Sequence, residues 1–286
     1  MEERLKPIWL SIFGNMVLSV FKLVIGFLYS SIALISDGIH SLSDVITSII
    51  GYFGIMISSK PPDKSHPFGH SRFEPLVALL IGEALLVVAY EIGRDAVFRI
   101  LHGKSVEVNS LMLVITIVSI LSKEAMARYS IHIGRKLRSQ ILIADAYHHR
   151  SDALSSVAVL FGLGTQKLGF EYGDALAGLI VAIFLVKVAF NVIMENLGYL
   201  TGQAPPFELC EDIKKIALEV SGVLGVHDLR AHYVGSRLHV ELHIEVSAEL
   251  TLKEAHDISE EVKRRIEQLE DVDTAFVHVD IQGITK

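Results

Sequence analysis

The sequence predicts a membrane α-helical bundle of six transmembrane helices, followed by a small C-terminal α+β domain. Two observations lead to this prediction: the chain is unusually apolar, and its apolar residues are unevenly distributed. Of the 286 residues, 51% are hydrophobic, and the mean hydropathy of +0.45 is too high for an ordinary soluble domain. Nearly all long apolar runs fall within residues 1–200, whereas residues 207–286 mix charged and apolar types as a small soluble domain does.

Six segments in the first 200 residues are candidate membrane spans, because a transmembrane helix needs about 20 mostly apolar residues. They are residues 8–28, 33–57, 76–98, 110–131, 141–166 and 173–197. The first lacks a small-residue cleavage site, so we interpret it as a span and not as a signal peptide. Lys and Arg concentrate at the N-terminus and in the connections after the second and fourth spans. The positive-inside rule therefore predicts that both termini are cytoplasmic.

The region after the last span is expected to be a separate cytoplasmic domain. Residues 201–206 form a short linker that ends in two prolines. Residues 207–286 are predicted to fold in the order αββαβ, with elements at 207–220, 224–234, 237–247, 251–269 and 273–281. Residues 238–246 alternate between apolar and polar types, which is typical of a strand with one buried face. We therefore expect a sheet with helices on its apolar face.

Charge and cysteine content exclude some functions. The net charge of −7 averages an apolar and a charged region, so it does not indicate a nucleic-acid partner. The single cysteine, Cys210, excludes an internal disulfide framework and any Cys-rich metal cluster.

Two matched pairs of polar residues lie inside predicted spans. His40 precedes Asp44 by four residues in the second span, and His148 precedes Asp152 by four in the fifth. Residues i and i+4 share one helix face, so each pair can direct an imidazole nitrogen and a carboxylate oxygen at a common point. Two such pairs on facing helices would supply four ligands, the number that a tetrahedral zinc ion takes. Mixed nitrogen and oxygen ligands suit Zn²⁺ and other first-row divalent ions better than Cu⁺.

The alternative is that these groups only form hydrogen bonds between packed helices. Ionisable side chains at membrane depth cost about 2.5–3.5 kcal/mol each on the lenient insertion scale and usually mark an ion or proton path, which favours the metal site. Asp37 and Asp145 each precede a pair by three residues, and we expect them to support the site and not to be ligands. The other candidates for buried polar residues are Asn15, Glu83 and Glu91, which packing would explain equally well.

With these pairs, the loop "DKSHPFGHSRFE" and the small C-terminal domain, the whole chain resembles the cation diffusion facilitators, which export divalent metals. In that family the second and fifth spans hold the transport site, and His/Asp in both goes with zinc. The resemblance implies a homodimer in the cell membrane that exchanges Zn²⁺ for protons, with Fe²⁺, Co²⁺, Cd²⁺ or Mn²⁺ as alternative cargo. A histidine-rich loop between spans four and five, common in eukaryotic members, is absent, which favours a prokaryotic-type member.

The resemblance also implies metal sites outside the membrane. In the loop, Asp63, His66 and His70 match a cytoplasm-facing zinc site, although a solvated turn would fit the loop sequence as well. Arg72 matches a basic position that helps to hold the dimer together. In the C-terminal domain, the positions that match a regulatory zinc site between two copies are His227, His243, His256, His278 and Asp280. His232 and His239 have no expected partner.

The C-terminal domain resembles metallochaperone folds, but it lacks their Cys-x-x-Cys motif, so a soluble metallochaperone role is unsupported. A membrane zinc metalloenzyme is disfavoured because hydrolytic zinc sites keep one position open and use a separate general base. A membrane-anchored metal sensor would not explain charged residues inside the spans. Zn²⁺ is therefore expected as the transported substrate and as a structural or regulatory ion.

Overall fold

The computed structural model describes residues 2–28, 32–102, 110–167 and 173–283. Within these ranges the side chains of some helical residues, including 32–37, 40 and 43, lie outside the described part. The chain divides into two compact units, Met1–Leu197 and Gly198–Lys286.

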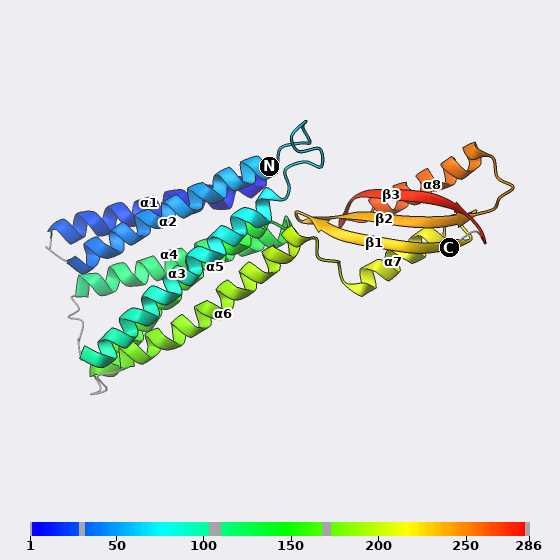
Figure 1. Ribbon diagram of the computed structural model, residues 1–286. Coiled ribbons are helices and arrows are strands. Elements are labelled where there is room, and N and C mark those ends of the chain that lie inside the picture. The colour runs from blue at the N-terminus through cyan, green and yellow to red at the C-terminus, as the bar shows by residue number, and fades with distance from the viewer. Residues whose placement is uncertain (1, 29–31, 103–109, 168–172, 284–286) are drawn as a thin grey trace. The chain divides into compact units, whose positions relative to one another are not determined.

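The first unit is a bundle of six long helices (Figure 1). They are α1 (Glu2–Leu28), α2 (Ile32–Ser58), α3 (Phe73–His102), α4 (Ser110–Lys136), α5 (Gln140–Lys167) and α6 (Gly173–Thr201). Each is 27 to 30 residues long, and at about 1.5 Å per residue such a helix can cross a hydrocarbon core of about 30 Å. The spans expected from the sequence are shorter than these helices because they comprise only the apolar part of each helix.

Three segments among the described residues are both long and apolar enough to cross a membrane, namely Glu2–Ile25, Phe73–His102 and Gly178–Thr201. Of the other helices, α4 and α5 carry charged residues within their length, which lowers their hydropathy. Phe13, Phe53 and Ile183 are exposed on this unit, as surface that faces lipid would be. Six spans remain the prediction from the sequence.

Helix packing in the first unit uses both large apolar and small residues. Ile8 of α1, Ile55 of α2 and Ile141 of α5 are fully buried in one cluster. At Gly82 of α3 the chain approaches α6 so closely that an added Cβ would lie 3.0 Å from a side-chain carbon of Ile193. These contacts fix the faces that the helices turn towards one another.

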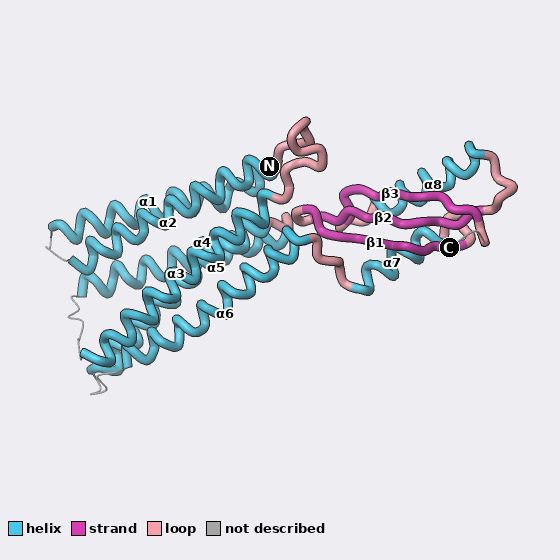
Figure 2. The backbone as a smooth tube through the Cα atoms, in the orientation of Figure 1, coloured by secondary structure: helices cyan, strands magenta, loops and turns pink. Residues whose placement is uncertain are grey.

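The second unit is a three-stranded sheet with two helices, drawn with magenta strands in Figure 2. Its elements are α7 (Phe207–Leu218), β1 (Gly225–Val234), β2 (Arg237–Val246), α8 (Leu252–Glu267) and β3 (Val272–Ile281). The strand order is β1-β2-β3, with β1 antiparallel and β3 parallel to the central strand β2. The chain reaches β3 through α8, as a parallel pair requires. The order αββαβ agrees with the prediction.

One face of β2 forms the core of this unit. Leu238, Val240 and Leu242 are at most 1% exposed and belong to one cluster with Ile213 of α7 and Ile266 of α8. The alternate residues of β2 point to the other face, because successive side chains of a strand alternate. That second face carries the histidines considered below.

Candidate functional site

Three of the four residues expected at the membrane site lie together in the first unit. Asp44 comes from α2, and His148 and Asp152 come from α5, one turn apart on the same face. Each is at most 6% exposed, and their candidate ligand atoms all lie within 4.8 Å of one another. Nε2 of His148 is 3.2 Å from Oδ1 of Asp44, and its Nδ1 has no hydrogen-bond partner among the described residues. This group can offer one imidazole nitrogen and two carboxylates to a cation.

The fourth expected ligand is His40. It lies on α2, four residues before Asp44, but its side chain is outside the described part of the structure. The same holds for the side chain of Asp37, so its supporting role stays a prediction.

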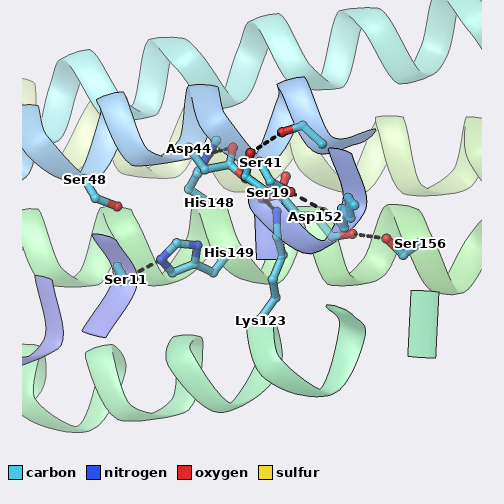
Figure 3. Close-up of polar contacts among 12 residues, drawn as sticks. Ser11, Ser19, Ser41, Asp44, Ser48, Lys123, His148, His149, Asp152 and Ser156 are labelled. Atoms are coloured by element: carbon cyan, nitrogen blue, oxygen red, sulfur yellow. Dashed lines mark hydrogen bonds and ion pairs between the residues drawn. The ribbon is translucent and has the colours of Figure 1, made fainter. Parts of the chain in front are cut away.

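A lysine that the sequence reasoning missed lies between the two carboxylates. Nζ of Lys123 on α4 donates to Oδ2 of Asp44 at 2.7 Å and to Oδ2 of Asp152 at 2.5 Å (Figure 3). Its side chain is 3% exposed. The sequence does contain a signal for this residue: Lys123 falls inside the predicted span 110–131. Charged residues at membrane depth usually pair with one another, so a partner could have been expected.

Asp145, expected to support the site, is fully buried and bonded on several sides. It accepts hydrogen bonds from Oγ of Ser11 at 3.1 Å and Oγ of Ser48 at 3.4 Å, and Nε2 of His149 lies 3.4 Å away. The same His149 nitrogen is 2.8 Å from Oγ of Ser11 (Figure 3). These contacts join α5 to α1 and α2 beside the residues that would hold the cation.

Of the other polar residues expected to be buried, one is buried and two are exposed. Asn15 is fully buried, and neither polar atom of its side chain has a partner among the described residues. Glu83 and Glu91 are exposed in the single chain, so the expectation of burial was wrong for them.

The loop between α2 and α3 brings its three expected residues together. Oδ1 of Asp63 is 3.5 Å from Nδ1 of His66, and Oδ2 is 3.4 Å from Nε2 of His70. The backbone N–H of His66 donates to Asp63 at 2.7 Å and holds the pKa of that carboxyl below its usual value. The loop therefore offers two imidazoles and an ionised carboxylate, while Arg72 beyond them is exposed.

In the second unit, three histidines surround Asp280 on the face of the sheet opposite the core. Its Oδ2 lies 2.8 Å from Nδ1 of His243 and 3.3 Å from Nε2 of His227, and its Oδ1 lies 3.4 Å from Nε2 of His278. Strand register explains this, because His243 pairs with His227 on one side and with His278 on the other. The hydrogen bond with His243 lowers the pKa of Asp280.

Two further observations concern the other histidines of this unit. His256 is exposed on α8, and among the described residues of one chain it does not join the group formed by His227, His243 and Asp280. His239, expected to have no partner, is 6% exposed, with Nε2 3.6 Å from a carboxylate oxygen of Asp273 and its ring 5.9 Å from that of His232.

These features define a class of protein: a helical membrane protein with buried carboxylate and imidazole groups, joined to a soluble α+β unit. Residues 8–201 match the family model of the cation efflux transmembrane domain, and residues 205–282 match that of the cation efflux protein cytoplasmic domain. The chain therefore belongs to the cation efflux family, the cation diffusion facilitators.

The chain is similar to proteins from several kinds of organism. An uncharacterized transporter of Methanocaldococcus jannaschii is 60% identical over 98% of this chain and 99% of its own length. Metal tolerance protein C1 of Arabidopsis thaliana is 35% identical over 98% of this chain and 63% of its own length. Manganese efflux system protein MneS of Bacillus subtilis is 31% identical over 94% of this chain and 93% of its own length.

Members of this family are transporters and not enzymes. The chain is accordingly a multi-pass membrane protein that exports divalent metal cations.

Proposed function

We propose that this protein exports Zn²⁺ from the cytoplasm in exchange for protons, as a homodimer in the cytoplasmic membrane. Residues 1–200 form the transport unit, residues 201–206 the linker and residues 207–286 the cytoplasmic metal-binding and dimerisation domain. The observation that carries the proposal is the convergence of Asp44, His148 and Asp152, all at most 6% exposed inside the helix bundle. Buried ionisable groups at membrane depth are costly and usually mark an ion path.

The ligand types favour zinc. With the imidazole of His40, the site would offer two imidazoles and two carboxylates, which would suit a four-coordinate Zn²⁺ ion. Ligand type alone separates Zn²⁺ poorly from Fe²⁺, Co²⁺ and Cd²⁺. Mn²⁺ is the second candidate, because two of the ligands are carboxylates and a relative covering 94% of this chain is named as a manganese efflux protein.

The chemistry of the ligands supports proton exchange. A metal binds only the neutral imidazole of His148, so protons and metal compete for the same nitrogen. Protonation from the far side of the membrane would help to expel the metal and would carry H⁺ back.

Alternating access requires one side of the site to close while the other opens. At the end of the bundle assigned to the cytoplasm, the guanidinium of Arg4 donates to Glu74 of α3 and to the carbonyl of Leu137, both at 2.9 Å. Beyond Lys123, towards the opposite helix ends, lies a cavity of about 260 Å³ that also reaches Asp152. Closure on one side and space on the other support a state open to the far side.

The sites outside the membrane are proposed to regulate transport. Asp63, His66 and His70 would hold a cytoplasmic Zn²⁺ ion in the loop, since their candidate ligand atoms lie within 4.8 Å of one another. In the homodimer, zinc held by the group around Asp280 would tighten the interface between the C-terminal domains. His256, exposed on α8, would join that site from a partner copy.

Flux measurements test the proposal. Purified protein in proteoliposomes is given a pH gradient and, in separate runs, Zn²⁺, Mn²⁺, Fe²⁺, Co²⁺ or Cd²⁺. Zinc flux driven by the gradient should be fastest, should vanish in Asp152→Asn, and should persist in Asp212→Asn. Asp212 is a matched control because it is an exposed carboxylate on α7, outside all the proposed sites.

Each part of the proposal can fail separately. Flux retained in Asp152→Asn would remove the membrane site, faster Mn²⁺ flux would replace zinc by manganese, and flux indifferent to the pH gradient would exclude proton exchange.

A further inference from the structure

We propose that Lys123 is a tethered counter-cation of the transport site: its ammonium group takes the cation position when cargo is absent and is displaced when the metal binds. This inference rests on the proposed function, because it assigns a second occupant to the same carboxylates. It makes Lys123 a residue that sets metal affinity and metal release without ligating the metal.

The position of the ammonium group is the first argument. Nζ lies 2.7 Å from Asp44 and 2.5 Å from Asp152, so it bridges the two carboxylates that come from different helices. A zinc ion bound to both carboxylates would need Zn–O distances of about 2.0–2.2 Å. A metal cation at that distance and the ammonium group would then lie side by side in a buried site and repel each other, because both carry positive charge, so they compete for the two carboxylates.

Charge balance is the second argument. Two ionised carboxylates buried at membrane depth and left without a cation would pay a large desolvation cost. Lys123 offsets that cost in the empty site, whereas a divalent ion neutralises both carboxylates by itself. The lysine is therefore needed when the carrier is empty and unnecessary when it is loaded.

The structure also provides a place for the displaced ammonium group. The residues that line the cavity of about 260 Å³ include Lys123, Asp152, Ser119 of α4, and Glu91 and Asp95 of α3. Lys22 of α1 also lines it, and its ammonium group donates to Oγ of Ser41 at 3.0 Å. A helical side chain leans towards the N-terminal end of its helix, and Ser119 lies one turn in that direction. The flexible four-carbon stem of a lysine suits such a movement.

Of the two acidic residues on α3, Glu91 is the better acceptor for this second position. Asp95 is already paired with Arg99 at 2.7 Å, and no ion pair of Glu91 is found among the described residues. The movement from Asp44 and Asp152 towards Glu91 requires no change in the protonation of Lys123.

The inference predicts that loss of Lys123 changes the zinc affinity in the direction opposite to the one that a purely structural role would give. If Lys123 only held the helices together, its loss would weaken metal binding through a loosened site. If it competes with the metal, its loss strengthens metal binding and slows release. Lys123→Met removes the charge with little change in length, and Lys123→Arg keeps the charge.

The test is equilibrium Zn²⁺ binding to the full-length protein in detergent at about pH 8, above the ordinary pKa of histidine. It uses a background in which Asp63→Ala and Asp280→Ala remove the loop and C-terminal sites. Lys123→Met should bind Zn²⁺ at least about tenfold more tightly, a difference of about 1.4 kcal/mol. In proteoliposomes it should turn over more slowly at saturating zinc. Lys123→Arg should keep the affinity of the parent protein.

Further variants keep the inference falsifiable if Lys123→Met fails to fold. Glu91→Gln should weaken zinc binding several-fold while Lys123 is present and, where the double variant folds, should have no effect beside Lys123→Met, a coupling that a double-mutant cycle measures. Equal or weaker binding in folded Lys123→Met, or unchanged binding in Glu91→Gln, would overturn the inference. If the parent protein binds no metal that Asp152→Asn removes, the proposed function fails, and the inference fails with it.

Discussion

Replacing Asp44 by asparagine is the most informative single change at the membrane site. Asp44 is 1% exposed and contacts both Lys123 and His148, at 2.7 Å and 3.2 Å. Asparagine keeps the shape of the side chain and one oxygen, so the change removes a charge and little else.

The expected loss of zinc affinity can be estimated from the charges. Opposite unit charges about 4 Å apart attract by about 4 kcal/mol at an effective dielectric constant of about 20. A divalent ion gains about twice that from one carboxylate, or about 8 kcal/mol, and the displaced ammonium group of Lys123 gives up about 4 kcal/mol. The carboxylate therefore favours zinc over the ammonium group by about 4 kcal/mol, so Asp44→Asn should weaken zinc binding by a factor on the order of 1,000.

Calorimetric titration of the purified protein measures this loss. The titration needs the background that lacks Asp63 and Asp280, because zinc bound in the loop or at the C-terminal domain would mask the membrane site. Asp212→Asn serves as the matched control for loss of a single carboxylate elsewhere. A fall in affinity of less than about threefold in Asp44→Asn, well under 1.4 kcal/mol, would refute the assignment of Asp44 as a ligand.

Three further predictions concern regions outside this site. His66→Ala removes one imidazole from the group around Asp63, so the protein should bind one zinc ion fewer by metal analysis and retain transport; unchanged stoichiometry would exclude a loop site. Thr251→Ala removes the side chain that accepts a backbone N–H in the first turn of α8, and should destabilise the C-terminal unit by about 1 kcal/mol in thermal unfolding, whereas an unchanged midpoint would exclude that cap. Arg4→Ala removes the ion pair to Glu74 that we propose closes the cytoplasmic end of the bundle, so backbone hydrogen exchange at the start of α5 should become faster, and equal rates would argue against a closing role.

The sequence predicted the elements well where local pattern determines them. The predicted order αββαβ is found, and the predicted strand 237–247 is observed as β2 at Arg237–Val246, because alternation of apolar and polar residues sets both its ends and its faces. The pair His148 and Asp152 lies on one face of α5 as the spacing of four predicts, because helical geometry alone fixes it.

The sequence did not predict what depends on packing between distant elements. Lys123 lies 79 positions after Asp44 in the chain, and no local pattern states which face of α4 turns towards α2 and α5. Likewise, the pairing of His239 with Asp273 arises from the parallel register of β2 and β3, which the sequence alone did not fix. His256 is the opposite case. Its position matches the family pattern, but among the described residues of one chain it does not join the group formed by His227, His243 and Asp280.

A zinc-soaked crystal structure with anomalous diffraction measured at the zinc absorption edge tests the central claim most directly. The account predicts an anomalous peak about 2.0–2.2 Å from ligand atoms of Asp44, His148 and Asp152, with the ammonium group of Lys123 no longer between the two carboxylates. A zinc-loaded protein with no peak at these residues, and with Lys123 still bridging Asp44 and Asp152, would contradict it.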